Sequence, residues 1–151
     1  METGKRIRAG AIIVIDGKLV TMYREFQGRI YYTFPGGKQE DGESLEDCAK
    51  RETLEEFGLV VEPIKQVYVY ECERSIEYYY TCKLISGEFG SGTGEEFDEN
   101  PQYGVYKPMM IDIKELPSIP LMPPEIAEAF YNDYIVNGES LRDNVGEFRC
   151  K

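Results

Sequence analysis

The stretch that organises this chain is residues 37–59, which read GKQEDGESLEDCAKRETLEEFGL. Its second half is typical of a helix with a marked start and a marked end. Ser44 and Asp47 approximate a capping box, with Asp in place of the usual Glu or Gln. Gly58 is the residue type that most often ends a helix in the left-handed conformation. We therefore expect a helix over residues 45–57.

The acids of this helix lie on an unexpected face. The apolar stripe that should face the core consists of Leu45, Cys48 and Ala49. At 100° per residue, Glu52 and Glu56 lie within about 20° of the stripe centre, and Glu55 lies about 80° from it. Such a cluster opposes the helix macrodipole and brings like charges close together. Either these are ordinary solvated acids, or a cation compensates them, and carboxylate oxygens are the ligands that Mg²⁺ prefers.

The residues before the helix favour a close backbone approach. Pro35-Gly36-Gly37 follows an expected strand and should end its regular pairing. Because the two glycines lack a Cβ, their backbone groups can come close to a metal or a phosphate. The simpler alternative is a connecting loop.

The rest of the chain predicts a mixed sheet with few helices. Asp16-Gly17 is a hairpin-turn dipeptide, and Ser86–Asn100 is a long glycine-rich loop that we expect to become more ordered on binding a ligand. The expected strands are Arg6–Ile15, Lys18–Arg24 (half exposed), Ile30–Phe34, Glu62–Cys72, Ser75–Ile85 and Tyr103–Ile111, and the further helical segments are Asp112–Leu116 and Pro124–Val136. We predict one α/β (α+β) domain, residues 1–151, around a central mixed β-sheet.

Composition excludes several kinds of chemistry. The 151 residues include 17 Lys and Arg against 28 Asp and Glu, for a net charge of −11, and no His. Without His, neither a Ser-His-Asp triad nor a His-bound zinc site can form. An acidic chain gains nothing from phosphate counterion release, so bulk nucleic acid is an unlikely partner. An anionic ligand would need divalent cations to mediate its contact.

The four cysteines, at positions 48, 72, 82 and 150, form no C-x-x-C pair. We expect free thiols in a reducing cytoplasm. No apolar run approaches the roughly 20 residues of a membrane helix. The first ten residues, METGKRIRAG, lack the apolar region of a secretory signal.

Taken together, these residues resemble the Nudix box, G-x5-E-x7-R-E-U-x-E-E-x-G-U. The matching positions are Gly37, Glu43, Arg51, Glu52, Glu55, Glu56 and Gly58. Thr53 departs from the pattern, since it stands where a bulky aliphatic residue is usual. Thr is close to Val in volume, so we expect a packing cost rather than a loss of chemistry.

The resemblance implies an α/β/α sandwich that hydrolyses a nucleoside diphosphate linked to another moiety with Mg²⁺ or Mn²⁺. It implies that Glu52 and Glu56 are metal ligands, that Glu55 is a further ligand, and that the Gly36 carbonyl also contacts the metal. Arg51 would orient the carboxylates. Glu43 would be a weaker or indirect metal contact.

Other site residues are expected on weaker grounds. Glu96, or its neighbour Glu95, is the loop acid that could complete the metal shell or take a proton from water. Arg24 and Lys38 are candidates for binding substrate phosphates, with solvated surface charge as the alternative. Several tyrosines could stack on a base or simply pack in the sheet, namely Tyr31, Tyr32, Tyr78, Tyr79 and Tyr80.

The substrate class follows by elimination. Arg74 and Ser75 occupy the positions where the ADP-ribose branch of the family usually has Pro, and Arg24 lies one residue late for the coenzyme A signature. A nucleoside triphosphate, whether normal or oxidised, is the expected substrate, with monophosphate and pyrophosphate as products. A dinucleoside polyphosphate and a non-catalytic nucleotide sensor remain alternatives, and a homodimer is left open.

Overall fold

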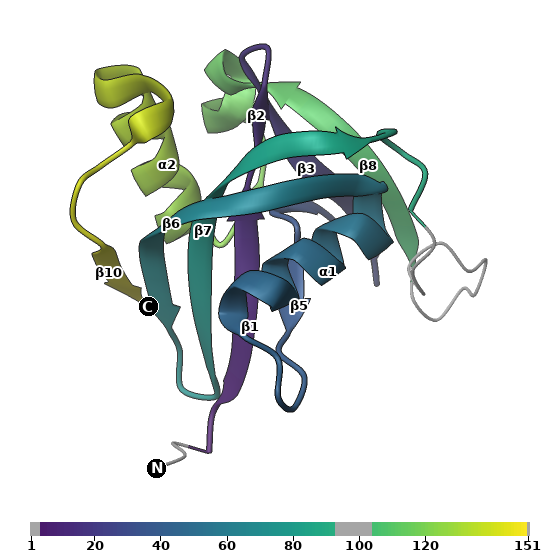
Figure 1. The fold of residues 1–151 in the computed structure, drawn as a ribbon. Helices are drawn as coiled ribbons and strands as arrows, with labels where there is room; N and C mark the ends of the chain where they lie inside the picture. The colour runs from purple at the N-terminus through teal and green to yellow at the C-terminus, as the bar shows by residue number, and fades with distance from the viewer. Residues whose placement is uncertain (1–3, 93–103, 151) are drawn as a thin grey trace.

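Two mixed sheets and two helices build the molecule in the computed structural model, which describes residues 4–92 and 104–150 (Figure 1). Sheet A has the strand order β10-β6-β7-β1-β5 and sheet B the order β2-β3-β4-β9, with β8 paired to β3. The expected mixed α/β fold is confirmed, except that strands predicted for one sheet divide into two. No helix in the described ranges combines the length and apolar character needed to cross a membrane.

Each of the two sheets has five strands. The strands of sheet A are β1 (Arg6–Ile12), β5 (Gly36–Lys38), β6 (Leu59–Glu71), β7 (Ser75–Gly87) and β10 (Gly146–Arg149). β1 runs parallel to β7 and antiparallel to β5, while β10 runs parallel to β6. Sheet B consists of β2 (Val14–Ile15), β3 (Lys18–Phe26), β4 (Arg29–Thr33), β8 (Val105–Asp112) and β9 (Leu121–Met122). The turn at Asp16-Gly17, where both residues have positive φ, joins β2 to β3 as predicted.

The helix α1 (Leu45–Phe57) begins and ends where the sequence predicts. The Ser44 hydroxyl accepts a hydrogen bond from the Asp47 N–H at 3.0 Å, which satisfies one of the free donors of the first turn. Gly58 adopts the left-handed conformation with φ 73°, and its N–H donates to the Leu54 carbonyl. Both ends of the helix are therefore set by local side-chain and backbone chemistry.

The two helices cover opposite faces of sheet A (Figure 1). Cys48 and Ala49 of α1 pack on Ala9, whereas Ile126 and Phe130 of α2 (Pro124–Asn137) pack in a cluster with Ile12. Since neighbouring residues of a strand point to opposite faces, β1 contributes to a core on each side. The remaining helical segments are the short 3₁₀ turns η3 (Ile113–Ser118) and η4 (Gly138–Ser140).

Several sequence expectations are wrong in detail. Gly36–Lys38 does not end regular pairing but forms β5, because its backbone pairs with β1 from Arg8 to Gly10. β3 is not half exposed, since the run from Leu19 to Met22 is buried on both faces. The predicted loop starts later, because β7 continues through Gly87. The hairpin of β6 and β7 has four buried tyrosines, namely Tyr68, Tyr70, Tyr79 and Tyr80.

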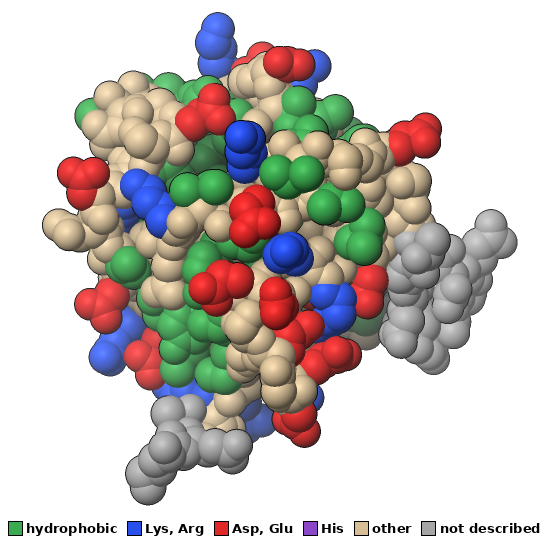
Figure 2. All heavy atoms as spheres, viewed as in Figure 1, with side chains coloured by type: hydrophobic (Ala, Val, Ile, Leu, Met, Phe, Trp, Pro, Cys, Tyr) green, Lys and Arg blue, Asp and Glu red, His purple; other side chains and the backbone are tan. Residues whose placement is uncertain are grey.

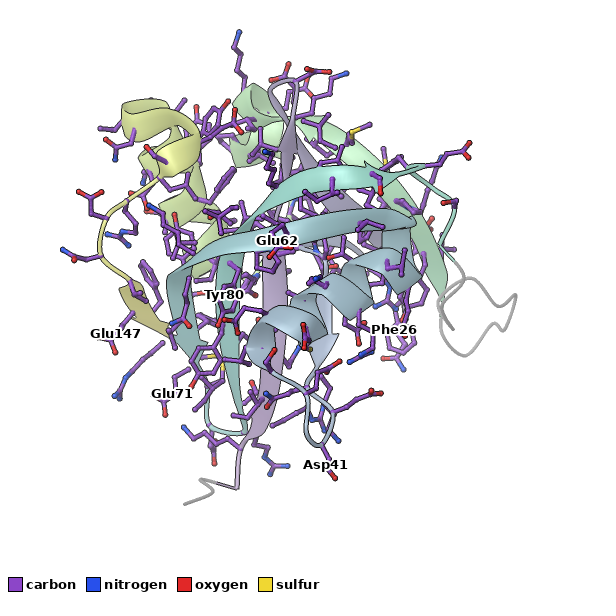
Figure 3. All side chains as sticks on the ribbon, in the orientation of Figure 1. Phe26, Asp41, Glu62, Glu71, Tyr80 and Glu147 are labelled. Atoms are coloured by element: carbon purple, nitrogen blue, oxygen red, sulfur yellow. A yellow bond between two sulfur atoms is a disulfide. The ribbon has the colours of Figure 1, made fainter. Side chains whose placement is uncertain are left out.

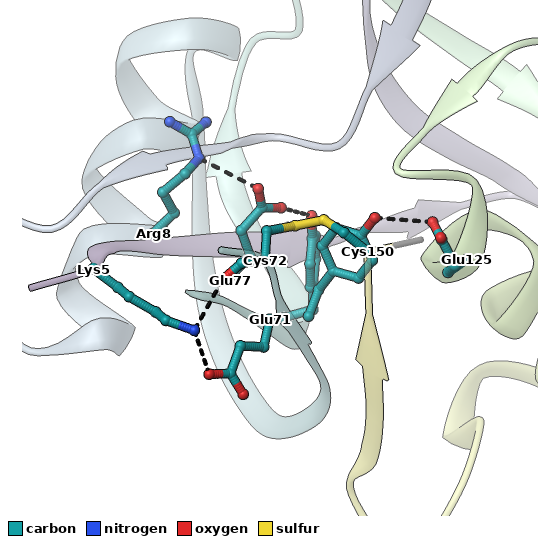
Figure 4. Close-up of a disulfide and its surroundings, with 9 residues drawn as sticks. Lys5, Arg8, Glu71, Cys72, Glu77, Glu125 and Cys150 are labelled. Atoms are coloured by element: carbon teal, nitrogen blue, oxygen red, sulfur yellow. Dashed lines mark hydrogen bonds and ion pairs between the residues drawn. A yellow bond between two sulfur atoms is a disulfide. The ribbon is translucent and has the colours of Figure 1, made fainter. Parts of the chain in front are cut away.

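The prediction of four free thiols is also wrong, since Cys72 and Cys150 form a disulfide (Figure 4). β10, which the sequence did not predict, pairs Arg149 with Glu71. The residue that follows each of these strands is a cysteine. The Cα atoms of the two cysteines are 5.1 Å apart, within the usual range for a disulfide. The expected cytoplasmic location rested partly on free thiols, so the disulfide removes that argument. Cys48 and Cys82 are free.

Candidate active site

Arg51 is the centre of the polar cluster on α1. Its Nε donates to Glu43 at 2.7 Å and its Nη1 to Glu52 at 3.0 Å. The same Nη1 reaches Glu55 at 3.3 Å, and Nη2 donates to the Lys38 carbonyl at 3.0 Å. One guanidinium thus ties three carboxylates of the helix and its preceding loop to the end of β5. Figure 2 shows acids and cations interleaved over this face of the molecule.

The charges in this cluster stabilise one another. The hydrogen bond from Arg51 is the main cause that holds the pKa of Glu43 below its usual range. The same bond is the largest of the effects that raise the pKa of Arg51. The Glu43 side chain is only 13% exposed, so water screens this pair weakly. Glu43 therefore acts on α1 through Arg51.

The two glycines of β5 touch the inward acids directly. The Gly36 N–H donates to Glu56 Oε1 at 3.0 Å. A Cβ placed on Gly37 would lie 2.4 Å from Glu52 Cδ, so any other residue there would displace that carboxylate. The two acids that the helical wheel turned inward therefore lie against the glycines of the expected motif, whereas Glu55 is 45% exposed.

The burial of Thr53 explains why this departure from the expected motif is tolerated. The residue is completely buried on the core side of α1, as an aliphatic residue there would be. Its Oγ1 has no hydrogen-bond partner among the described residues. A buried hydroxyl without a partner costs free energy. The departure thus affects packing and stability rather than the carboxylates.

The donor chemistry of this site fits a hard divalent cation. Glu52, Glu55 and Glu56 supply carboxylate oxygens, and Gly36 has a backbone carbonyl close by. Within residues 4–92 and 104–150, no three acidic, Cys or His side chains are already gathered closely enough to hold a metal ion. Arg51 engages Glu52 and Glu55, and the Gly36 N–H engages Glu56. These carboxylates would have to turn from their present partners to bind the ion.

The other predicted residues lie in several places. Arg24 is on β3 of sheet B, where its guanidinium carbon lies 3.6 Å from the centre of the Tyr106 ring. The Lys38 side chain is exposed, and only its carbonyl joins the cluster through Arg51. Glu95 and Glu96 lie outside the described residues, as does most of the loop expected over Ser86–Asn100.

A cavity of about 180 Å³ lies beside Gly36 and Gly37, and part of its lining comes from residues that the sequence did not indicate. Its polar side chains include Arg8 and Glu77, which the parallel register of β1 and β7 places opposite each other. The Tyr79 hydroxyl donates to Glu77, and Arg8 Nε lies 3.9 Å from the same carboxylate. Burial is the main cause that raises the pKa of Tyr79 far above its usual value, so it stays a donor. No periodicity could reveal this group, because it depends on strand register.

Of the tyrosines considered for base stacking, Tyr79 lines this cavity and packs edge-on against Phe34. Tyr31 lies 5.6 Å from the Arg24 guanidinium carbon, and Tyr32 packs edge-on against Tyr23. Tyr80 is buried on β7 (Figure 3), and Tyr78 is half-buried on the same strand. Most of these rings thus have packing roles within the protein.

The NUDIX domain family model matches residues 4–128, which is most of the chain. The chain belongs to the Nudix family. A curated relative, an uncharacterized Nudix hydrolase called YvcI from Bacillus subtilis, is 24% identical over 132 residues, covering 86% of this chain and 78% of its own. The protein is therefore a Nudix hydrolase, that is, a pyrophosphohydrolase, and the family generally uses a divalent metal.

Solved Nudix structures share the fold at low sequence identity. A Nudix hydrolase from Nitrosomonas europaea superposes with a TM-score of 0.74 and 18% identity, covering 99% of this chain and 82% of that one. An ADP-ribose pyrophosphatase from Streptococcus suis has a TM-score of 0.62 and 20% identity, with 95% and 97% covered. A MutT Nudix hydrolase from Burkholderia pseudomallei has a TM-score of 0.64 and 24% identity, with 82% and 95% covered. At these identities the likeness establishes the Nudix fold alone.

Proposed function

We propose that this Nudix pyrophosphohydrolase acts on a nucleoside triphosphate, normal or oxidised, and releases the monophosphate and pyrophosphate. The observation that carries the proposal is the contact of Glu52 and Glu56 with the two glycines of β5, beside the cluster that Arg51 holds. All four box carboxylates are present, which favours catalysis over a sensor that binds without turnover. Arg74 and Ser75 stand where the ADP-ribose branch of the family usually has Pro, which speaks against the substrate of the ADP-ribose pyrophosphatase from Streptococcus suis.

The residues have separate roles in this proposal. Glu52, Glu55 and Glu56, with the Gly36 carbonyl, would hold Mg²⁺ or Mn²⁺, and Glu96 would add a further carboxylate. When bound, the metal neutralises phosphate oxygens and lowers the pKa of a coordinated water. Glu56 or another of these carboxylates takes the proton of the attacking water. Arg51 keeps the carboxylates on one side of the helix.

The organic part of the substrate has a place of its own. The cavity beside Gly36 is smaller than the roughly 300–1,000 Å³ that is usual for whole ligands, so it suits one planar group rather than a complete nucleotide. Arg8 can donate to and Glu77 can accept from the edge of such a group. Arg24 and Lys38 are the proposed phosphate contacts. They offset the net charge of −11, which otherwise repels an anionic substrate.

We also propose that the whole chain is one domain. The family model ends at residue 128, but the segment beyond it continues the same core. Phe130 and Leu141 are buried in the cluster that contains Val67, and β10 pairs with β6. A cytoplasmic location remains part of the proposal, and measurement of the solution mass would distinguish a monomer from a homodimer.

A nucleotide panel tests the proposed activity. We expect pyrophosphate release from at least one nucleoside triphosphate with Mg²⁺ or Mn²⁺, and none in excess EDTA. Faster turnover of ADP-ribose or a dinucleoside polyphosphate would correct the substrate while leaving the chemistry in place. Nucleotide binding without release of any product would establish the sensor instead. Equal turnover in EDTA would reject the metal-dependent mechanism.

A further inference from the structure

The disulfide at the edge of sheet A lies beside a polar cavity of about 420 Å³ (Figure 4). Glu71 on β6 and Glu147 on β10, both labelled in Figure 3, mark the two strands that the bond joins. The cavity is lined by Lys5, Glu71, Cys72, Glu73, Arg149 and Cys150. It therefore presents two cationic and two acidic side chains together with both bonded cysteines.

The four cysteines differ in access. Cys150 is exposed and Cys72 is half-buried, so a small molecule in the cavity can reach the bond. Cys48 is completely buried, and burial raises the pKa of its thiol to about 11. Burial likewise raises the pKa of the Cys82 thiol to about 12. Since the thiolate is the reactive form, Cys48 and Cys82 are poor partners for exchange.

Lys5 places a positive charge next to Cys72. Its Nζ donates to the Cys72 carbonyl at 3.0 Å and to the Glu71 carboxylate at 2.6 Å. In thiol–disulfide exchange, a sulfur leaves faster when its thiolate is stabilised. A thiol that attacks the exposed Cys150 sulfur would release, as a thiolate, Cys72, the residue whose backbone carbonyl accepts from this ammonium group.

We infer that Cys72–Cys150 is a redox modification site that exchanges with a small peptide thiol of the glutathione class. Such a thiol carries carboxylates and an ammonium group, which match the cations and acids of the cavity. Its thiolate attacks Cys150 Sγ, the protein S–S bond breaks, and Cys72 leaves with the electron pair. A second thiolate attacks the sulfur of the bound peptide thiol, releasing the symmetrical peptide disulfide and Cys150 as a thiolate. The two protons of the reacting thiols end on Cys72 and Cys150, so the protein gains two electrons and two protons.

The bond holds a segment that lies beyond the part matched by the family model. β10 has only four residues, followed by one further backbone bond from the Cys150 N–H to the Glu71 carbonyl. Phe148 adds an edge-on contact with the Tyr68 ring. Apart from the disulfide, few contacts hold this short strand, so reduction of the bond should loosen β10 and leave α1 in place.

The test equilibrates the native full chain in buffers of reduced and oxidised glutathione, followed by alkylation and peptide mapping. We expect two alkyl groups to appear as reduced glutathione rises, on Cys72 and Cys150, while Cys48 and Cys82 stay unlabelled. Hydrogen exchange in β10 should accelerate on the order of tenfold, with residues 45–57 unchanged. Cys150→Ser cannot form the bond, so hydrogen exchange in β10 should be fast in every buffer. Cys72→Ser removes the other cysteine and should give the same result. Cys82→Ser is the matched control and should behave as the parent.

Two outcomes would overturn the inference. One is labelling of Cys72 and Cys150 even in excess oxidised glutathione, because the bond then does not form. The other is a bond that persists in excess reduced glutathione while the protein stays folded, because it is then a static crosslink. Lys5→Gln should slow the thiol–disulfide exchange with glutathione about two- to fivefold. Lys18→Gln, on the far hairpin, should leave its rate unchanged. None of these readouts depends on the proposed hydrolysis.

Discussion

The helices α1 and α2 are similar in length, at 13 and 14 residues, but they differ in what their side chains do. α1 ends in a turn that contains acids and no basic residue, which is unfavourable at the negative end of a helix dipole. α2 has no side-chain cap at its start and packs Ile126 and Phe130 completely into the core. The difference suggests that α1 gives up local stability for chemistry, while α2 supplies stability through apolar packing.

The largest effect is expected from removing the core anchor of α2. Phe130→Ala should lower the free energy of unfolding by about 3–5 kcal/mol, because it leaves a cavity against Phe34 and Tyr134. Denaturant unfolding measures the change. Ile135→Ala, at an exposed position of the same helix, should stay within about 0.5 kcal/mol of the parent. Similar losses for both variants would mean that α2 is not the anchor that its burial indicates.

Glu56→Gln should separate activity from stability on α1. We expect turnover to fall at least about 100-fold, the scale of losing a metal ligand or a positioned base. Without metal, relief of carboxylate repulsion should leave stability unchanged or raise it by up to about 1 kcal/mol. The stabilisation by Mg²⁺ should shrink, because a ligand that binds only the native state stabilises by RT ln(1 + [L]/Kd).

Paired initial rates and melting temperatures, with and without Mg²⁺, provide this test. Glu46→Gln, in the first turn of the same helix, is the control and should keep both its rate and its Mg²⁺ shift. A Glu56→Gln protein with near-normal turnover and an unchanged Mg²⁺ shift would remove Glu56 from the site. A much lower metal-free melting temperature would show that its bond from the Gly36 N–H supports the fold.

The smallest expected effect is the pH dependence that Glu43 imparts through Arg51. The pKa of Glu43 is lower in the folded protein than in the unfolded chain, chiefly because Arg51 donates to it. Its stabilisation is therefore complete above the unfolded pKa of about 4.3 and is lost as the pH falls through the folded value. Melting temperatures measured over this acid range should fall less steeply for Glu43→Gln than for the parent.

Glu40→Gln is the matched control for this variant. Its carboxylate lies 3.5 Å from the same Arg51 but is 67% exposed, so water screens it more strongly. In this control, the melting temperature should fall with decreasing pH as steeply as it does in the parent. If it falls as steeply in Glu43→Gln too, the Arg51 pair does not set the acid sensitivity of α1.

The sequence predicted the features of α1 because they depend on neighbours along the chain. Ser44 and Gly58 act within one turn of the helix ends, and the 3.6-residue period places Glu52 and Glu56 on the inner face. The spacing from Gly37 to the acids could also be recognised in the sequence, but the contact of Gly37 with the Glu52 carboxylate could not. Local propensity likewise predicted most strands, but not how they divide between two sheets.

Only the tertiary structure decided the features that depend on strand register. Arg8 meets Glu77 because β1 and β7 are parallel neighbours, and Cys150 meets Cys72 because β10 pairs with β6. Neither pair has a local signal, since its members lie far apart in the chain and a shift of one residue would turn them to opposite faces. The sequence by itself therefore determined the helix α1 and the carboxylates of the proposed site, whose geometry is local. The cavity beside the glycines of β5 and the disulfide at the sheet edge required the fold, because pairing between distant strands creates them.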